Sequence, residues 1–152
     1  MIDKIDKTIL RIMEQDGRIS FSELSDQIHL SKTPSWSRVQ ALEKQKVITG
    51  YRAVLSPEAL GLDLQAFVQV RVNSDRQHMF EEAVQRHGSI LACYATTGEA
   101  DYLLHVLVPN VAALDELVRT QIASMPGVKG LFTVIGLKII KRHGLVMDCL
   151  PQ

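Results

Sequence analysis

The 152-residue sequence predicts an α+β fold with two units, an N-terminal winged helix-turn-helix and a C-terminal ferredoxin-like β-α-β-β-α-β unit. Within the first 55 residues, three stretches have apolar residues at helical spacing, and a very short turn separates the last two. From residue 64 onward, strand-like and helix-like stretches alternate in the ferredoxin-like order. We therefore expect domains over residues 1–55 and 64–152, joined by a linker over residues 56–63.

Two helix starts are marked near the N-terminus. Asp3 is a candidate N-cap, and Asp6 lies in the first turn, where the helix dipole favours a carboxylate. Apolar residues follow at helical spacing until Gly17, which is expected to end this helix. The sequence from Ser20 to Glu23 has the pattern of a capping box and predicts the start of a second helix.

A third helix is predicted to begin at Ser31, which can cap it, with Pro34 in its first turn. Trp36, Val39 and Leu42 recur at helical spacing and are expected to face the core, so core packing is favoured for Trp36 over stacking on a base. Polar and cationic side chains lie largely off that face: Lys32, Thr33, Ser35, Ser37, Arg38 and Gln40. Such groups contact phosphates and base edges, and a recognition helix reads DNA mainly with its N-terminal residues.

The charge distribution agrees with a nucleic-acid partner, although the formal net charge is zero. Between residues 28 and 52, five Lys and Arg residues stand against one acidic residue, Glu43. A local basic patch is compatible with DNA binding, whereas a solvated helix face on any small three-helix domain is the alternative. Residues 47–55 are rich in β-branched and aromatic side chains and predict a strand or small wing after the third helix.

The C-terminal half has four predicted strands and two predicted helices. The strands are expected over residues 64–72, 90–97, 101–108 and 128–140, and the helices over residues 75–87 and between Asn110 and Pro126. The turn at residues 98–100 is short enough to make the second and third strands an antiparallel hairpin.

The sequence contains no evident catalytic or metal site. Glu99 and Asp101 could form a general acid–base pair, but no nucleophile or metal ligand accompanies them. The five His and two Cys residues lack metal-binding spacing, and we expect no cofactor. No apolar run reaches the ~18 residues of a transmembrane helix, and no signal peptide is evident. We expect a cytoplasmic protein that is not an enzyme.

Four motifs resemble the Lrp/AsnC ("feast/famine") family of transcriptional regulators. They are DKIDKTIL at residues 3–10, LSKTPSWSRVQALEKQKVITGYRA at residues 30–53, TGEADYLL at residues 97–104 and MPGV at residues 125–128. The resemblance covers almost the whole chain and implies that the C-terminal β-α-β-β-α-β domain is a ligand-sensing domain. It also implies dimers formed through the C-terminal sheets, octameric assemblies of dimers, and effectors, usually amino acids, bound between C-terminal domains.

The resemblance also assigns site residues by position. It implies DNA contacts at Ser31, Lys32, Thr33, Ser35, Ser37 and Arg38, and an effector loop at Thr97, Gly98, Glu99, Ala100, Asp101 and Tyr102, with the turn at residues 125–127 as a candidate neighbour. Gly98 would let a ligand approach the backbone, and free N–H groups at a turn hold carboxylates. Asp101 either accepts from an α-ammonium group or braces the loop. Many members have Cys in place of Ser35 and Lys or Arg in place of Ser37.

These observations predict a sequence-specific DNA-binding transcriptional regulator modulated by a small molecule, with an amino acid as the expected effector. Its expected partners are double-stranded DNA, the effector and further copies of the chain in a dimer or octamer. One alternative is an architectural DNA-binding protein that responds to no ligand. Another is a small-ligand enzyme or carrier whose helical half serves oligomerisation, which the missing nucleophile or metal set disfavours.

Overall fold

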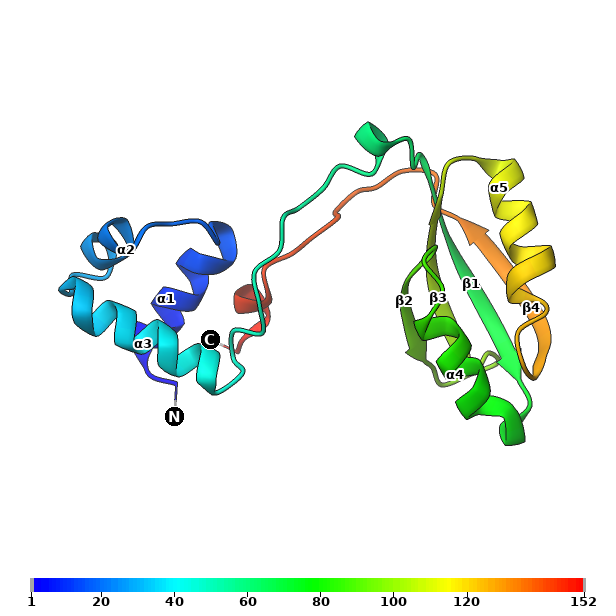
Figure 1. Ribbon diagram of the computed structural model, residues 1–152, viewed down its shortest axis with the longest axis horizontal. Helices are drawn as coiled ribbons and strands as arrows, with labels where there is room; N and C mark the ends of the chain where they lie inside the picture. Colours follow the sequence, from blue (N-terminus) through cyan, green and yellow to red (C-terminus); the bar gives the residue numbers. More distant parts are fainter. Residues whose placement is uncertain (1, 152) are drawn as a thin grey trace. The chain divides into compact units, whose positions relative to one another are not determined.

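The computed structural model describes residues 2–151, which form two compact units (Figure 1). The N-terminal unit comprises residues 2–54 and 140–151, and the C-terminal unit comprises Leu55–Ile139. The expected domain boundaries therefore differ at two places, and the linker expected over residues 56–63 lies within the C-terminal unit. The last segment of the chain, expected in the C-terminal domain, belongs to the N-terminal unit because it packs there.

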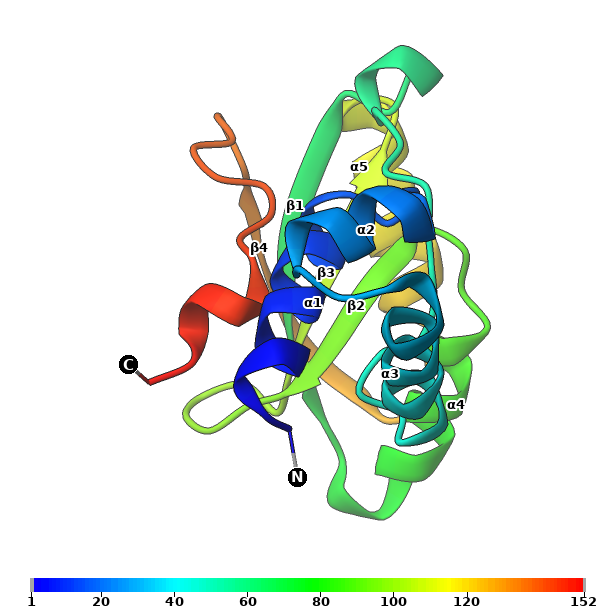
Figure 2. The same ribbon diagram turned by 90° about the vertical axis from the view of Figure 1, so that its left-hand side faces the viewer.

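Three helices form the N-terminal unit: α1 (Lys4–Gln15), α2 (Phe21–Gln27) and α3 (Lys32–Lys44) (Figure 2). Asp3 caps α1 by accepting a hydrogen bond from the Asp6 amide at 2.8 Å, and Ser20 and Glu23 form the predicted capping box of α2. The turn between α2 and α3 contains His29 in the left-handed conformation, with φ of 54°. These features confirm a helix-turn-helix.

The core of this unit corrects one sequence prediction. Val39 and Leu42 are buried with Ile9 and Leu24, as expected, but Trp36 is 51% exposed. The inward position one residue earlier is held by Ser35, which is fully buried. Residues 35, 39 and 42 form a row on one helix face, and each further residue turns the direction by about 100°. Trp36 therefore points away from the core.

The predicted wing does not form a strand. Residues 47–55 have no regular secondary structure, and no described segment pairs with them in a sheet. β-branched composition alone does not make a strand, because the backbone groups need a partner strand.

The end of the chain returns to the first helix. A short 3₁₀ helix, Val146–Cys149, lies against α1, and Met147 is buried there. The Glu14 carboxylate accepts hydrogen bonds from the amides of Val146 at 2.6 Å and Met147 at 3.0 Å. These contacts place the C-terminal segment in the N-terminal unit.

The C-terminal unit has the predicted ferredoxin-like order. Its elements are β1 (Leu64–Val72), α4 (Gln77–Gln85), β2 (Ile90–Ala95), β3 (Tyr102–Val108), α5 (Val111–Glu116), which continues as a π-helix over Leu117–Ile122, and β4 (Val128–Ile135). The strands lie in the order β2-β3-β1-β4, and each pair is antiparallel. The bounds of β1 agree with the prediction, whereas β4 ends five residues earlier than expected.

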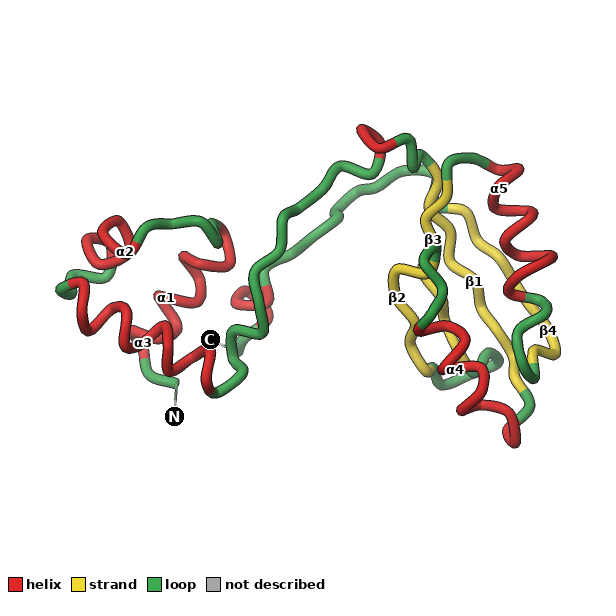
Figure 3. Tube along the Cα trace, viewed as in Figure 1, coloured by secondary structure: helices red, strands yellow, loops and turns green. Residues whose placement is uncertain are grey.

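The two faces of this sheet have different partners. Alternate residues of β1, from Ala66 to Val72, are buried in a core that includes Phe80 of α4 and Leu114 of α5, so both helices cover this face (Figure 3). The opposite face, here called the open face, has no covering element within the unit. Phe67 and His105 stack there with ring centroids 4.9 Å apart, and burial lowers the pKa of His105. No described helix is long and apolar enough to cross a membrane.

Candidate functional site

The start of α3 presents part of the predicted DNA-contact set. Ser31, Lys32, Thr33 and Ser37 are exposed. The Ser31 side chain makes no capping hydrogen bond, so the first-turn amides of α3 have no side-chain cap. Free amides at a helix start and an adjacent Lys are suited to a phosphate.

Ser35 does not belong to this surface. Its side chain is fully buried, and its hydroxyl donates to the carbonyl oxygen of Ser31 at 2.9 Å. A small residue at this position lets α3 pack closely on the core. The expected DNA contact of Ser35 is therefore wrong, because its only hydrogen-bonding group is occupied inside the unit.

Arg38 is also placed differently from the prediction. Its Nη1 donates to Asp3 Oδ2 at 2.7 Å and to Asp6 Oδ1 at 2.8 Å, and the side chain is 32% exposed. These two carboxylates raise the pKa of Arg38. The guanidinium therefore ties α3 to the first turn of α1 instead of projecting from the outer face.

Trp36 is a surface residue that the periodicity argument missed. With Phe21, Lys32 and Thr33 it lines a hollow of about 280 Å³ on α2 and α3. Apolar periodicity did not reveal this, because the core-facing position before Trp36 is held by a polar residue, Ser35.

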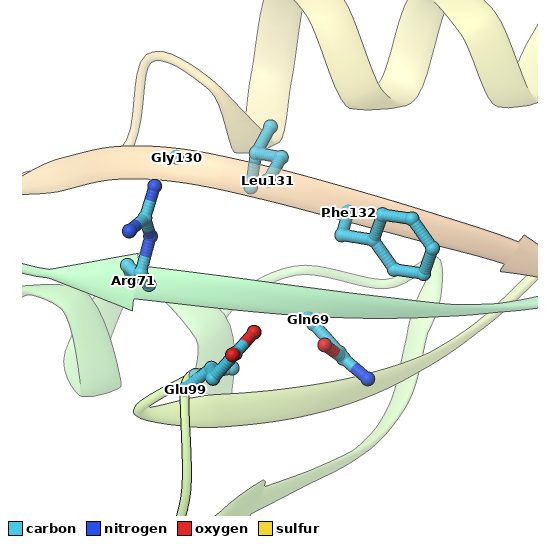
Figure 4. A pocket seen from close by; sticks show the side chains of 7 residues that line it. Gln69, Arg71, Glu99, Gly130, Leu131 and Phe132 are labelled. Carbon is cyan, nitrogen blue, oxygen red and sulfur yellow. The ribbon is translucent and has the colours of Figure 1, made fainter.

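A second candidate site lies on the open face of the C-terminal sheet. A cavity of about 680 Å³ is lined by Gln69, Arg71, Glu99, Ala100, Gly130, Leu131 and Phe132 (Figure 4). The strand register creates it, since Gln69 lies opposite Phe132 and Arg71 opposite Gly130. The turn between β2 and β3 supplies Glu99 and Ala100.

The cavity holds two charged groups of opposite sign. Figure 4 shows Arg71 of β1 reaching toward Gly130 of β4, with the Glu99 carboxylate beside the same cavity. A Cβ atom at residue 130 would lie 2.9 Å from Arg71 Nη2, so glycine leaves room for the guanidinium. Neither the Arg71 guanidinium nor the Glu99 carboxylate makes a hydrogen bond or ion pair with another residue between 2 and 151. Both groups remain available to a ligand.

Only part of the predicted effector loop lines the cavity. Thr97, Gly98 and Glu99 are exposed, and Gly98 has φ of +116°, a conformation that favours glycine. Of the six loop residues, Glu99 and Ala100 line the cavity. The turn at residues 125–127 does not line it.

Asp101 braces the backbone. Its Oδ2 accepts a hydrogen bond from the Val72 amide at 2.7 Å, and its own amide donates to the Val70 carbonyl at 3.0 Å. The turn is closed by Thr96, whose amide donates to the Asp101 carbonyl at 2.9 Å. Of the two roles open for Asp101 from the sequence, the structure shows the brace. This use also removes Asp101 from a general acid–base pair with Glu99.

Tyr102 lies on the helix-covered face, so its predicted place in the effector loop is wrong. The side chain is buried against Phe80, with ring centroids 4.8 Å apart, and its hydroxyl donates to Glu81 Oε1 at 2.7 Å. Burial and the neighbouring Glu81 raise the pKa of Tyr102 to about 12. The physical reason is the strand alternation: Tyr102 begins β3 with its side chain directed into the core.

The sequence did not identify Gln69, Arg71, Gly130 and Phe132 as site residues. Alternation along β1 places Gln69 and Arg71 on the open face, but the pairing of β1 with β4 is a long-range contact. No described group of His, Cys, Asp or Glu side chains is arranged to hold a metal ion. The arrangement is suited to binding a small zwitterion.

A helix-turn-helix unit combined with a second unit that carries a charged cavity defines a DNA-binding regulator with a ligand-binding domain. The family model of the AsnC-type helix-turn-helix domain matches residues 2–43. The model of the Lrp/AsnC ligand binding domain matches residues 65–146.

Known relatives and solved structures point to the same family. Leucine-responsive regulatory proteins of Salmonella typhimurium and Escherichia coli are each 38% identical over 144 residues, covering 93% of this chain and 88% of the relative. A transcriptional regulator from Neisseria meningitidis in complex with L-Met is similar with a TM-score of 0.93 and 34% identity, over 96% of both chains. An AsnC family regulator from Agrobacterium tumefaciens has a TM-score of 0.89 and 30% identity, over 98% of this chain and 99% of that one. The chain belongs to the Lrp/AsnC family and is a transcriptional regulator.

The Arg38 ion pairs predict a pH-dependent stability. Arg38→Ala should lower the Tm of the N-terminal unit at pH 7, because Asp3 and Asp6 lose their shared cation. The hydrogen bond from the Asp6 amide and then Arg38 hold the pKa of Asp3 below its ordinary value of 3.8. A lowered native pKa stabilises the fold above 3.8, and this contribution is lost as the pH falls through the native value. Thermal denaturation of wild type and variant should therefore converge in acid, with exposed Arg18→Ala as control. A constant Tm difference down to pH 2.5 would contradict this account.

The Asp101 brace predicts a loss of stability that depends on the acceptor. Asp101→Ala leaves the part-buried Val72 amide without its partner and should lower the free energy of unfolding by about 1–3 kcal/mol. Asp101→Asn keeps an oxygen that can accept this hydrogen bond and should lose less. Urea denaturation followed by circular dichroism measures both. Equal stability of Asp101→Ala and wild type would show that the hydrogen bond from the Val72 amide to Asp101 does not stabilise the fold.

Proposed function

We propose that this regulator binds duplex DNA with the start of α3 and that an amino acid bound in the open-face cavity changes its DNA affinity. The observation that carries the proposal is the pair Arg71 and Glu99, two opposite charges without described partners in one cavity. The L-Met complex of the Neisseria relative supports an amino acid as the ligand class.

The chemistry of the cavity fits an α-amino acid. A guanidinium binds a carboxylate with two parallel hydrogen bonds, which suits Arg71. The Glu99 carboxylate accepts from an α-ammonium group. Phe132 supplies apolar surface for a side chain such as that of leucine or methionine. An acid or amine lacking the second charge would leave one protein charge unpaired and bind less well.

On DNA, the exposed residues divide into two roles. Lys32 and the first-turn amides of α3 contact phosphate, which fixes the position of the helix. Thr33 and Ser37 offer hydroxyls to base edges in the major groove. Arg38 acts as a positioning residue through its ion pairs with α1. We place this DNA-binding regulator in the cytoplasm, where its two free cysteines, Cys93 and Cys149, would stay reduced.

The open face supports a dimer. Phe67, Phe132 and Val134 expose apolar surface on one side of a four-stranded sheet, and Leu103 and Leu107 of β3 extend it. Apolar sheet faces pack against each other at about 10 Å. Two copies joined in this way carry two recognition helices, which lets the dimer bind two DNA half-sites. Octamers formed from such dimers are the further assembly that we propose.

The effector proposal is tested with cavity variants. A thermal-shift screen of the twenty amino acids identifies the ligand, and calorimetry measures its affinity. Arg71→Ala should weaken binding by roughly 10-fold to 100-fold, since a hydrogen bond to a charged group contributes about 1.5–3 kcal/mol. Glu99→Gln should weaken it less, because an amide oxygen still accepts. Arg86→Ala, at the exposed C-cap of α4 and outside the cavity, is the control.

DNA affinity with and without the ligand completes this test. A coupling of about 1–3 kcal/mol is expected in wild type and must be reciprocal. Arg71→Ala should keep ligand-free DNA binding and lose the response. Unchanged ligand affinity in both variants would place the effector site elsewhere.

If two open faces form the dimer, one charge introduced at the centre of this face should prevent dimerisation. Phe67→Lys places an ammonium group at the centre of that face, where burial against a second copy would be unfavourable. Light scattering at micromolar concentration should show a dimer or larger species for wild type and a monomer for the variant. Leu137→Lys, at an exposed position after β4, is the control. A monomeric wild type would contradict the proposal.

A further inference from the structure

The hollow lined by Phe21, Lys32, Thr33 and Trp36 exposes two aromatic side chains on the helix-turn-helix. Phe21 is 40% exposed and Trp36 is 51% exposed. Phe21 begins α2 and Trp36 lies in the second turn of α3, so both helices contribute to the hollow. We call it the Phe21–Trp36 hollow.

The folding of the unit does not require Trp36 at this position. The core is formed by Ile9, Leu24, Val39 and Leu42, and Ser35 occupies the neighbouring inward position of α3. An indole left half in water forgoes the free energy that its burial would contribute. Exposed aromatic carbon of this kind is expected where a ligand covers it.

The surroundings of the hollow indicate DNA as that ligand. Lys32 lies four residues before Trp36 and Thr33 lies three before it, so all three share one face of α3. Lys32 supplies a cation at the edge of the hollow, and the uncapped start of α3 adds the positive end of the helix dipole. An anionic duplex is the charge-complementary partner, and α3 is the second helix of the helix-turn-helix, the position of a recognition helix.

We propose that the Phe21–Trp36 hollow receives the C5-methyl group of a thymine in the major groove and that Trp36 is a specificity-determining residue. The inference rests on the proposed DNA binding by α3. The thymine methyl is the apolar group that base pairs present in the major groove, whereas the other base-edge groups are hydrogen-bond donors and acceptors. An apolar hollow beside a phosphate-binding lysine therefore discriminates thymine from cytosine without a hydrogen bond.

The size of the hollow favours this occupant over a protein. About 280 Å³ accommodates a methyl group and the adjoining base edge. A stable protein interface needs about 1,000 Å² of buried surface, which two aromatic side chains do not supply. A second copy of the chain seated on this hollow is an outcome that the experiment below detects.

The test removes the methyl group from the DNA and the indole from the protein. A binding site is selected from random duplexes with the wild-type full-length protein, and each thymine is then replaced by deoxyuridine, one at a time. For wild type, replacing one thymine in each half-site should weaken DNA binding about fourfold, the equivalent of about 0.8 kcal/mol for one buried methyl group. Trp36→Ala should bind the thymine and deoxyuridine probes equally. Deoxyuridine outside the half-sites is the control probe.

Control variants keep the result interpretable. Val54→Ala removes exposed apolar surface elsewhere in the same unit and should retain the thymine preference. Trp36→Phe should retain part of it. If Trp36→Ala binds too weakly for measurement, Phe21→Leu removes the other wall of the hollow and should reduce the preference in the same way.

Three results would overturn the proposal. Wild type that binds DNA but shows no deoxyuridine effect would refute methyl recognition while leaving DNA binding intact. A thymine preference that survives in Trp36→Ala would place the methyl contact elsewhere. A change of oligomeric state in Trp36→Ala, seen by light scattering without DNA, would make the hollow a protein interface. Failure of wild type to bind any duplex would instead refute the proposed function itself.

Discussion

The two-residue period of β1 is the constraint on which the C-terminal unit depends. This strand lies in the interior of the sheet and pairs with β3 and β4, so one set of its side chains must fill the core. Small β-branched and Ala residues occupy that set and pack under α4 and α5. The other set, which includes Phe67, Gln69 and Arg71, then has to face outward. A cavity with a cation and an exposed apolar surface both follow from this alternation.

The Asp101 brace connects this strand to the turn that supplies Glu99. By accepting from the Val72 amide at the end of β1, Asp101 holds the turn beside the strand that carries Arg71. A carboxylate used for this purpose is not available to a ligand, but it places a neighbouring carboxylate where a ligand can reach it. The resemblance to the family pointed to this turn, and hydrogen bonding decides which of its residues lines the cavity.

In α3, too, several side chains lie where their chemistry alone would not place them. Ser35 and Arg38 were assigned to DNA because hydroxyl and guanidinium groups suit phosphates and bases. Both instead hold α3 in place, Ser35 by allowing close packing and Arg38 by pairing with Asp3 and Asp6. The spacing of Trp36 with Val39 and Leu42 predicts a core position, and Trp36 is exposed. The polarity of a side chain therefore predicts its burial poorly when a small polar residue, such as Ser35, can donate its hydrogen bond to the helix backbone.

Local signals in the sequence were sufficient for the caps of α1 and α2, the bounds of β1, the hairpin between β2 and β3, and the ferredoxin-like order. Each depends on neighbours within a few residues, through capping hydrogen bonds or side-chain periodicity. The cavity, the direction of Trp36, the Arg38 ion pairs and the return of residues 145–149 to α1 were not predictable in this way. They depend on strand register and on contacts between residues more than 30 positions apart, as in the pairing of Arg38 with Asp3. Such contacts form only after the elements pack, because packing determines which side chain meets which.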